Sequence, residues 1–385
     1  MSTDFIPLIV GLLVFLASLI SLELTLSVAI IEILLGAIAG YFGLQAEGWM
    51  LHLAGFGGIV LTFLAGTEID MKLMKAKFKE SFLIGSFSFL FPFVGVTLYT
   101  YYAAHWTLQA SLIAGVALST TSLAVVYSVL VETGLSKTEI GKLIMAATFI
   151  TDMGTALALS FLFMKPTLYT LIFVVVSTIV IIFAAKFSHW VFNNAKWKNR
   201  VIEPEIKYLF LLLLVFMYFA KIGDGHAVLP AFLLGLFMSG HFSETSQTKV
   251  LRNRLRTVAY AIITPIFFVV GGLKVSVPMI VSAFGLFLIL FTLKIVTKFL
   301  GVYFLARKYI PDGSMYTTLL MSTGLTFGTI SSVFGLTSGI INQRQYSILV
   351  GVVIASAVIP TFIAQRWFMP VEEEDLVDWD NGNGK

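Results

Sequence analysis

The sequence predicts an all-α polytopic membrane protein with thirteen transmembrane helices. Of the 385 residues, 58% are hydrophobic and only 12% are charged, against roughly 25% charged residues in soluble domains. So few charged residues do not cover the surface of a soluble protein of this size. A transmembrane β-barrel is also excluded, because it alternates polar with apolar residues and does not reach this hydrophobicity. The third observation is a regular series of apolar stretches, each close to the ~20 residues that a membrane-spanning helix needs.

The apolar stretches give thirteen candidate spans along the chain. Turn and charge signals separate several of them, as at Lys165-Pro166 and Pro311-Asp312-Gly313. The first stretch follows no basic segment and precedes no small-residue cleavage site, so we expect a retained helix rather than a signal peptide. The spans lie near residues 5–22, 26–43, 52–68, 81–103, 109–131, 142–164, 167–185, 206–222, 226–241, 257–273, 276–306, 315–337 and 345–368.

Basic residues predict the orientation of these spans. Most Lys and Arg residues lie in loops that follow odd-numbered spans, whereas loops after even-numbered spans carry only Lys165, Lys221, Lys274 and Arg344. Basic loops stay on the cytoplasmic side. We therefore expect a multi-pass protein of the cell inner (plasma) membrane, with the N-terminus outside and the C-terminus in the cytoplasm.

The composition excludes several classes of protein. The chain has no cysteine, which excludes disulfides, thiol catalysis and Cys-ligated metal centres, and its net charge of +4 is too small for a nucleic-acid binder. The five histidines are dispersed near span ends, unlike the clustered ligands of a metalloprotease. An intramembrane aspartyl protease needs two carboxylates at one water, and Asp152 has no intramembrane Asp partner. We expect no enzyme and no cofactor.

Four ionisable residues lie inside predicted spans. They are Glu32 in the second span, Asp152 in the sixth, and Lys294 and Lys298 in the eleventh. A charge near the bilayer centre costs at least ~2.5–3.5 kcal/mol on insertion scales, so such a residue usually has a function or a partner. These four residues are the first candidates for a functional site.

Asp152 is the candidate for binding a cation and a proton in turn. Burial favours the protonated form of a carboxylate, whereas a bound cation such as Na⁺ favours the ionised form, so one Asp holds one or the other. Thr151 adds a neutral hydroxyl ligand beside it. A carboxylate that binds a cation or a proton in turn is the minimum requirement for cation/proton exchange. The structural alternative is an Asp that caps a broken helix or pairs with a lysine.

Lys294 and Lys298 share one face of the eleventh span because they are four residues apart. Either is placed to pair with Asp152 or to hold backbone carbonyls of an unwound helix. Lys298 alternatively snorkels to the cytoplasmic interface, which Lys294, nearer the middle of the span, reaches less easily. The spacing does not choose between the two lysines.

Two hydroxyl-rich segments interrupt the apolar pattern. Each lies in the fifth span of a six-span half, if spans 1–6 and 8–13 form two inverted halves joined by span 7. Broken helices at corresponding positions of two halves indicate a secondary-transporter site, and hydroxyl and carbonyl oxygens suit hard cations. The alternative is that small residues merely permit close helix packing. The residues in question are Ser119, Thr120, Thr121 and Ser122 in span 5, and Gly324 and Thr326 in span 12.

Seven short segments in order along the chain carry a family resemblance. The chain resembles the cation:proton antiporter-2 family, in particular NapA- and GerN-type Na⁺/H⁺ antiporters and the membrane part of Kef-type K⁺/H⁺ systems. The segments are 31–36 (IEILLG), 64–70 (LAGTEID), 118–122 (LSTTS), Thr151-Asp152, 230–235 (PAFLLG), 267–273 (FFVVGGL) and 297–301 (TKFLG).

The resemblance implies a thirteen-helix fold of the NhaA/NapA type, with two inverted repeats and two broken helices that cross in the core. It implies alternating access, in which the core moves against a homodimeric scaffold. The expected division is 1–80 scaffold helices 1–3, 81–164 core helices 4–6, 165–205 connecting helix 7 and cytoplasmic loop, 206–275 scaffold helices 8–10, 276–369 core helices 11–13, and 370–385 acidic cytoplasmic tail.

The resemblance also implies roles for single residues. It places cation and proton exchange on Asp152 and the family's lysine on Lys298, which leaves Lys294 as an addition or as a competitor for the same carboxylate. Glu32 matches a family glutamate with a structural or pathway-lining role. Electrogenic members carry two adjacent aspartates where this chain has Thr151-Asp152. One fewer carboxylate implies electroneutral 1:1 exchange, although a lysine at position 298 accompanies electrogenic members.

We therefore expect a monovalent cation/proton antiporter in the lipid membrane, with Na⁺ as substrate and K⁺ or Li⁺ as alternatives. Electrogenic exchange and, less favoured, a passive cation channel are the competing hypotheses. Hydroxyl and carbonyl ligands suit both Na⁺ and K⁺, so the sequence does not choose between these cations.

Overall fold

The computed structural model describes residues 5–24, 27–67, 77–163, 167–193, 203–223, 227–244 and 246–370, and all regular structure in them is helical. The predicted all-α class is confirmed. The acidic tail after Pro370 and most of the basic loop before Pro204 lie outside the described residues. Apolar sequence forms helices here because a helix satisfies its own backbone hydrogen bonds where no water is available.

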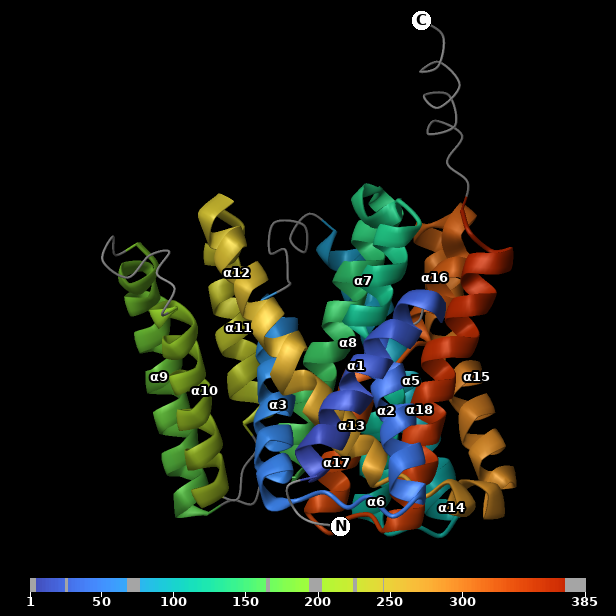
Figure 1. Cartoon of the computed structure of the whole chain (residues 1–385). Coiled ribbons are helices and arrows are strands. Elements are labelled where there is room, and N and C mark those ends of the chain that lie inside the picture. Colours follow the sequence, from blue (N-terminus) through green and yellow to red (C-terminus); the bar gives the residue numbers. More distant parts are fainter. Residues whose placement is uncertain are drawn as a thin grey trace, which may run out of the picture.

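The described residues of the first half of the chain form seven labelled α-helices (Figure 1). A single predicted span, 109–131, corresponds to two of them, because its helix is interrupted. The helices are α1 (Ile6–Leu24), α2 (Val28–Tyr41), α3 (Gly48–Thr67), α5 (Phe78–Tyr102), α6 (Leu108–Ser119), α7 (Leu123–Glu132) and α8 (Glu139–Phe163).

The second half repeats this organisation, and predicted span 315–337 is again two helices. The elements are α9 (Leu168–Asn193), α10 (Pro204–Ile222), α11 (Val228–Glu244), α12 (Ser246–Val258), α13 (Thr264–Leu273), α14 (Val277–Ser282), α15 (Phe284–Tyr309), α16 (Ser314–Met321), α17 (Thr326–Thr337) and α18 (Gln343–Trp367). Of the described helices, eight are long and apolar enough to cross a membrane, and shorter apolar helices accompany them. The exact count of thirteen crossings stays a prediction.

One span begins earlier than the sequence indicates. The expected span 257–273 is the end of a longer helical run, in which α12 leads through a π-helical turn at Ala259–Ile263 into α13. Arg254 in α12 lies 3.1 Å from the Glu203 carboxylate at the start of α10. The apolar pattern misses α12 because its polar face carries several basic residues, so that this part of the helix is amphipathic rather than uniformly apolar.

A four-helix layer is formed by two close helix pairs, α2 with α13 and α3 with α11. Glycines face each other at both contacts: a Cβ on Gly36 would collide with the Val269 carbonyl oxygen, and a Cβ on Gly66 with that of Phe232. Small residues let helix backbones approach closely, which stabilises helix pairs in lipid. Each pair joins one half of the chain to the other, as inverted repeats require.

The crossed-helix core consists of α5, α6, α7, α8, α15, α16, α17 and α18. Its centre is the contact of α5 with α15, the fourth spans of the two halves. Gly301 of α15 lies directly on the Phe87 backbone of α5, where a Cβ would not fit. The pairing of fourth span with fourth span, and of fifth with fifth at the crossing described below, agrees with the expected two inverted repeats.

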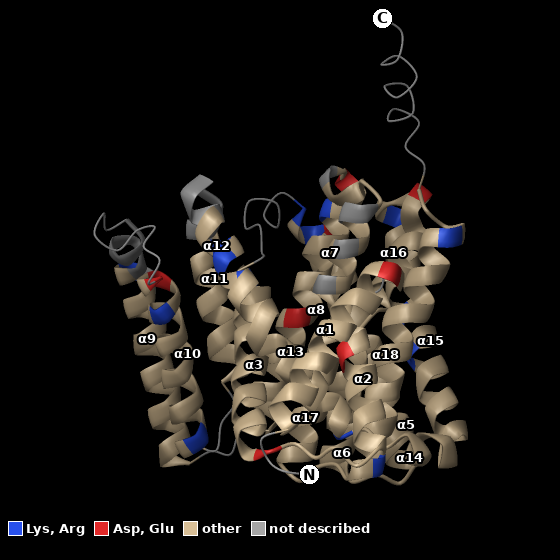
Figure 2. Cartoon of the chain, viewed as in Figure 1, with Lys and Arg blue, Asp and Glu red and all other residues tan. Residues whose placement is uncertain are grey.

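The helices stand roughly side by side, and the start of α1 and the end of α18 lie on opposite faces of the molecule (Figure 1). Lys and Arg gather on the face at the top of the view, where α7 ends and α12 and α16 begin, and few lie on the other face (Figure 2). This asymmetry agrees with the distribution of basic residues in the sequence.

Candidate cation site at the crossed helices

Both broken helices are interrupted by short buried non-helical segments, and the backbone of Thr120 in the first of them is extended. Helix α6 ends at Ser119 and α7 begins at Leu123, while α16 ends at Met321 and α17 begins at Thr326. The two interruptions cross and hydrogen bond: the Ser122 amide donates to the Thr323 carbonyl oxygen at 3.1 Å. The Thr121 hydroxyl donates to the Met321 carbonyl oxygen at 2.8 Å. These bonds use backbone groups that each helix end leaves unsatisfied.

Gly324 makes the crossing sterically possible. A Cβ at this position would lie 2.7 Å from the Thr120 hydroxyl and 2.8 Å from the Thr120 carbonyl oxygen, and it would collide with the Lys294 ammonium. Only glycine leaves room for three chain segments to meet here.

Asp152 lies on α8 beside this crossing and is 2% exposed. It lines a small cavity of about 20 Å³ with Thr326 of α17 and Tyr260 of the π-helical turn, closed by Leu61, Ala65, Leu123 and Phe327. About 10–15 Å³ accommodates one water-sized body. The cavity therefore has the size for one small ion or water molecule against the carboxylate.

Five of the six predicted hydroxyl ligands are buried and Thr326 is half-buried, and three of the six donate to their own helices. The hydroxyl groups of Thr151, Ser119 and Thr120 donate to the carbonyl oxygens of Thr148, Val116 and Ala117 respectively.

Two other hydroxyls span the crossing, because Ser122 and Thr326 share a hydrogen bond of 3.3 Å. A hydroxyl that donates its proton keeps lone pairs to accept or to coordinate a cation. Of the predicted ligands, the structure brings Thr326 to the Asp152 cavity, and Thr151 is not among the residues that line it.

Lys298 is fully buried and bonded within the core. Its ammonium donates to the Ser88 hydroxyl of α5 at 2.8 Å and to the Thr121 hydroxyl at 3.0 Å. The charges of Asp152 and Lys294 both act on it electrostatically. Lys298 thus does not snorkel, because its position and bonds hold it inside the protein.

Lys294 lies one turn away on the same face of α15 and is also fully buried. Its ammonium approaches Gly324 and Thr120 at the crossing. It has no hydrogen-bond partner among the described residues. The two lysines therefore differ. Lys298 is hydrogen bonded to α5 and to the crossing, whereas Lys294 packs against the crossing.

Glu32 lies apart from this cluster. It is 2% exposed on α2, the helix that packs on α13. Among the described residues, no hydrogen bond or ion pair joins it to Asp152. The structure brings together Asp152, Thr326 and the crossing with both lysines, and it leaves Glu32 in the four-helix layer.

Three phenylalanines connect the layer to the core next to the cavity. Phe327 of α17 lies edge-on to Phe232 of α11, with ring centroids 6.1 Å apart, and Phe232 stacks on Phe149 of α8 at 5.6 Å. Sequence reasoning did not single out these rings, because apolar aromatic residues occur throughout every span. Ser88 and Tyr260 were also missed, since nothing local to either distinguishes it from other span residues.

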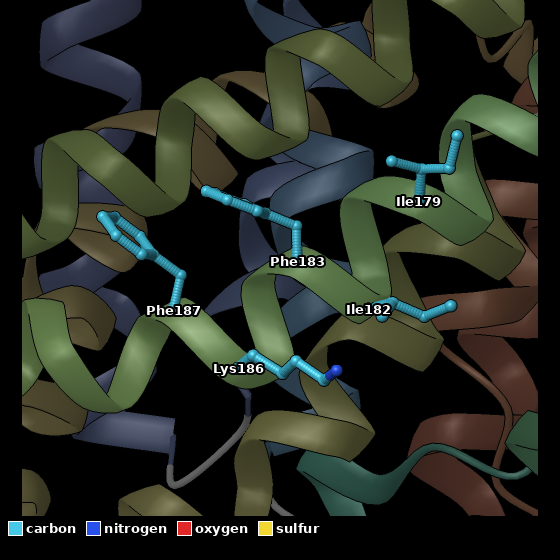
Figure 3. A pocket seen from close by; sticks show the side chains of 5 residues that line it. All are labelled: Ile179, Ile182, Phe183, Lys186 and Phe187. Carbon is cyan, nitrogen blue, oxygen red and sulfur yellow. The ribbon is translucent and has the colours of Figure 1, made fainter.

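A separate hollow of about 470 Å³ lies on an exposed side of α9. Figure 3 shows its lining side chains, Ile179, Ile182, Phe183, Lys186 and Phe187, all from this one helix. Phe183 and Phe187 stack with centroids 4.9 Å apart. Because one helix supplies every lining residue, this hollow is a surface groove and not part of the cation site.

Comparisons with known proteins agree with this geometry. Probable Na⁺/H⁺ antiporter 3 of Methanocaldococcus jannaschii is 27% identical over 354 residues, covering 87% of this chain and 88% of that protein. The Na⁺/H⁺-K⁺ antiporter GerN of Bacillus cereus is 24% identical over 341 residues, covering 86% of each. The solved structure of the sodium proton antiporter MjNhaP1 from M. jannaschii superposes with a TM-score of 0.67 at 14% identity, covering 94% of this chain and 98% of that one.

The profile of the transmembrane sodium/hydrogen exchanger family matches residues 10–369, nearly the whole described chain. Together with the inverted repeats and the crossed, broken helices, this match shows that the chain belongs to the sodium/hydrogen exchanger family.

Proposed function

We propose that the protein exchanges a monovalent cation for protons across the membrane by alternating access. The observation that carries the proposal is a buried carboxylate, Asp152, in a cavity with room for one small ion beside two crossed helix breaks. Isolated charges are not kept in the membrane interior without a function or a partner. The relatives named above are described as Na⁺/H⁺ antiporters, which supports the same activity here.

Asp152 serves as the exchange group in this proposal. A cation in the cavity requires the ionised carboxylate, and release of the cation lets a proton replace it. The Lys298 ammonium compensates the carboxylate charge when neither substrate is bound, because its charge and that of Asp152 interact. Thr326, which also lines the cavity, supplies a hydroxyl oxygen in this proposal.

Exchange of one cation for one proton is the stoichiometry we propose. Position 151, next to Asp152, holds a threonine, whose hydroxyl donates to the Thr148 carbonyl oxygen. A threonine carries no proton through the cycle, so a single carboxylate binds one proton or one cation in turn. Electrogenic exchange through an additional proton on Lys298 or Lys294 is the alternative.

The moving parts in this proposal are the crossed-helix core and the four-helix layer. The core carries Asp152, and the phenylalanine contacts at Phe232 lie where the two groups meet. We propose that the layer forms the scaffold of a homodimer in the plasma membrane. The face that gathers Lys and Arg would be cytoplasmic (Figure 2), with the N-terminus outside.

Reconstitution into proteoliposomes tests the function. An outward proton gradient should drive saturable uptake of ²²Na⁺, and the same assay with Li⁺ and K⁺ as competitors measures selectivity. Uptake that neither saturates nor responds to the proton gradient would indicate a passive channel instead.

Membrane voltage set with valinomycin tests the stoichiometry. One-for-one exchange predicts that voltage leaves the equilibrium ratio of cations unchanged at fixed pH gradient. A ratio that follows the voltage would establish electrogenic exchange and exclude the 1:1 proposal.

A further inference from the structure

A second, larger hollow lies between the core and the four-helix layer. This outer cavity, of about 440 Å³, is bounded by α3, α13 and α17 and by the ends of α10 and α11. It shares no lining residue with the Asp152 cavity. On α17 the lining residues Ile330, Val333, Phe334 and Thr337 follow helical spacing, so one face of that helix forms a continuous wall.

Two glycines of α3 form part of the wall of this cavity. Gly55 and Gly58 both line the outer cavity, and a Cβ on Gly55 would meet nothing within 4 Å. Gly55 and Leu51 are exposed, so the outer cavity is open to the surroundings of the protein along α3. The cavity has the volume of pockets that hold small organic ligands, roughly 300–1,000 Å³.

Among the described residues, the charged side chains at this cavity are all positive. Lys221 at the end of α10 and Lys274 at the end of α13 line it, and no acidic residue does. Among the described residues, neither lysine has an ion-pair partner. Burial lowers the pKa of Lys274, whose side chain is partly enclosed. A positively lined opening repels cations, so this cavity is unsuited to guide a cation toward Asp152.

An apolar interior with lysines at its edge matches an amphiphile with a negative head. We propose that the outer cavity binds the anion of a long-chain fatty acid, with its chain between α3, α13 and α17 and its carboxylate at Lys274. A single acyl chain has the size of a drug-like ligand, whereas a phospholipid brings two chains and a larger head. Acyl chains bind because apolar surface leaves water, and the ammonium fixes which end lies at the opening.

Photolabelling of the purified full-length protein in detergent tests this site. The probe is a sixteen-carbon fatty acid with a photoreactive diazirine on its chain, compared with the alcohol of the same length and with a diazirine-labelled phosphatidylglycerol. Saturable labelling by the acid, mapped by mass spectrometry to peptides around residues 51–59, 267–274 or 330–337, is expected. No ion gradient is used, so the result stands whether or not the protein exchanges cations.

Two variants separate the cavity from its charge. Gly55→Leu fills the space and should abolish the mapped labelling, whereas Gly285→Leu, at an equally open helical glycine on α15, should leave it intact. Lys274→Gln should weaken acid binding about tenfold and leave the alcohol unaffected, because a charge-assisted hydrogen bond is lost.

Equal labelling by acid and alcohol, equal effects of the two leucines, or preferential labelling by phosphatidylglycerol would each overturn the proposal.

Discussion

Lys298 and Thr121 are hydrogen bonded inside the protein, with the ammonium 3.0 Å from the hydroxyl oxygen. The same hydroxyl donates its proton to the Met321 carbonyl oxygen at the end of α16. Thr121 thereby connects three parts of the core: the lysine on α15, the break between α6 and α7, and the break between α16 and α17. A positive charge near the carbonyl end of a helix is also favourable.

Replacement of Thr121 tests whether these two hydrogen bonds stabilise the protein. Thr121→Val keeps the size of the side chain but removes both hydrogen bonds, which we expect to cost about 2–3 kcal/mol because a buried carbonyl and an ammonium each lose a partner. Thermal unfolding in detergent measures the loss. Thr121→Ser keeps the hydroxyl and should stay close to the wild type; a Val variant as stable as the Ser variant would show that these hydrogen bonds contribute nothing.

Replacing each of the two buried lysines with methionine should change the stability of the protein differently. Lys298→Met removes the positive charge that compensates the Asp152 carboxylate. We expect it to destabilise the folded protein by about 3–5 kcal/mol, as when one partner of a buried charge pair is removed. Combining it with Asp152→Asn should recover much of that loss, since the carboxylate charge then disappears. A double variant no more stable than Lys298→Met alone would contradict the coupling.

Lys294→Met is expected to be neutral or stabilising in the same assay. The ammonium is fully buried and has no hydrogen-bond partner among the described residues, and methionine is an apolar side chain of similar length. A loss as large as that of Lys298→Met would show instead that Lys294 has a compensating partner.

Gly324→Ala should disrupt the crossing. The added methyl group meets the Thr120 hydroxyl at 2.7 Å and collides with Lys294, so the segments must separate at a cost of about 1–3 kcal/mol. Gly285→Ala is the matched control, because nothing lies within 4 Å of its Cβ position. The melting temperatures of the two variants give the comparison, and equal values would refute the steric account.

The Glu139 carboxylate should make stability depend on pH. A hydrogen bond and charge from Lys142, then from Lys77, lower the pKa of Glu139, with distances of 3.2 Å and 3.5 Å. The stabilisation is therefore present above the ordinary pKa of glutamate and is lost as pH falls through the lowered value.

Glu139→Gln should accordingly reduce the melting temperature slightly at neutral pH and not at all in strong acid. The effect should be small because the carboxylate is exposed. A difference between variant and wild type that grows on acidification would have the wrong sign.

The sequence predicts the helices well and their contacts less well. The hydroxyl run at 119–122 indicated a helix break because such residues are poor lipid-facing side chains, and the structure breaks α6 there. The contact of Lys298 with Ser88 spans 210 residues of sequence, and no local signal predicts it. The start of α12 was missed for a different reason. Its sequence is amphipathic, and the prediction of spans relied on uniformly apolar stretches.

Cation-dependent proton flux through the Asp152→Asn variant tests the central claim most directly. The measurement uses proteoliposomes with an internal pH indicator, challenged with Na⁺, Li⁺ or K⁺, and Glu139→Gln serves as a control carboxylate on the exposed surface. We predict that Asp152→Asn abolishes both the proton flux and ²²Na⁺ uptake, while the control exchanges like the wild type. Cation-dependent proton flux retained by a folded Asp152→Asn variant would contradict the account.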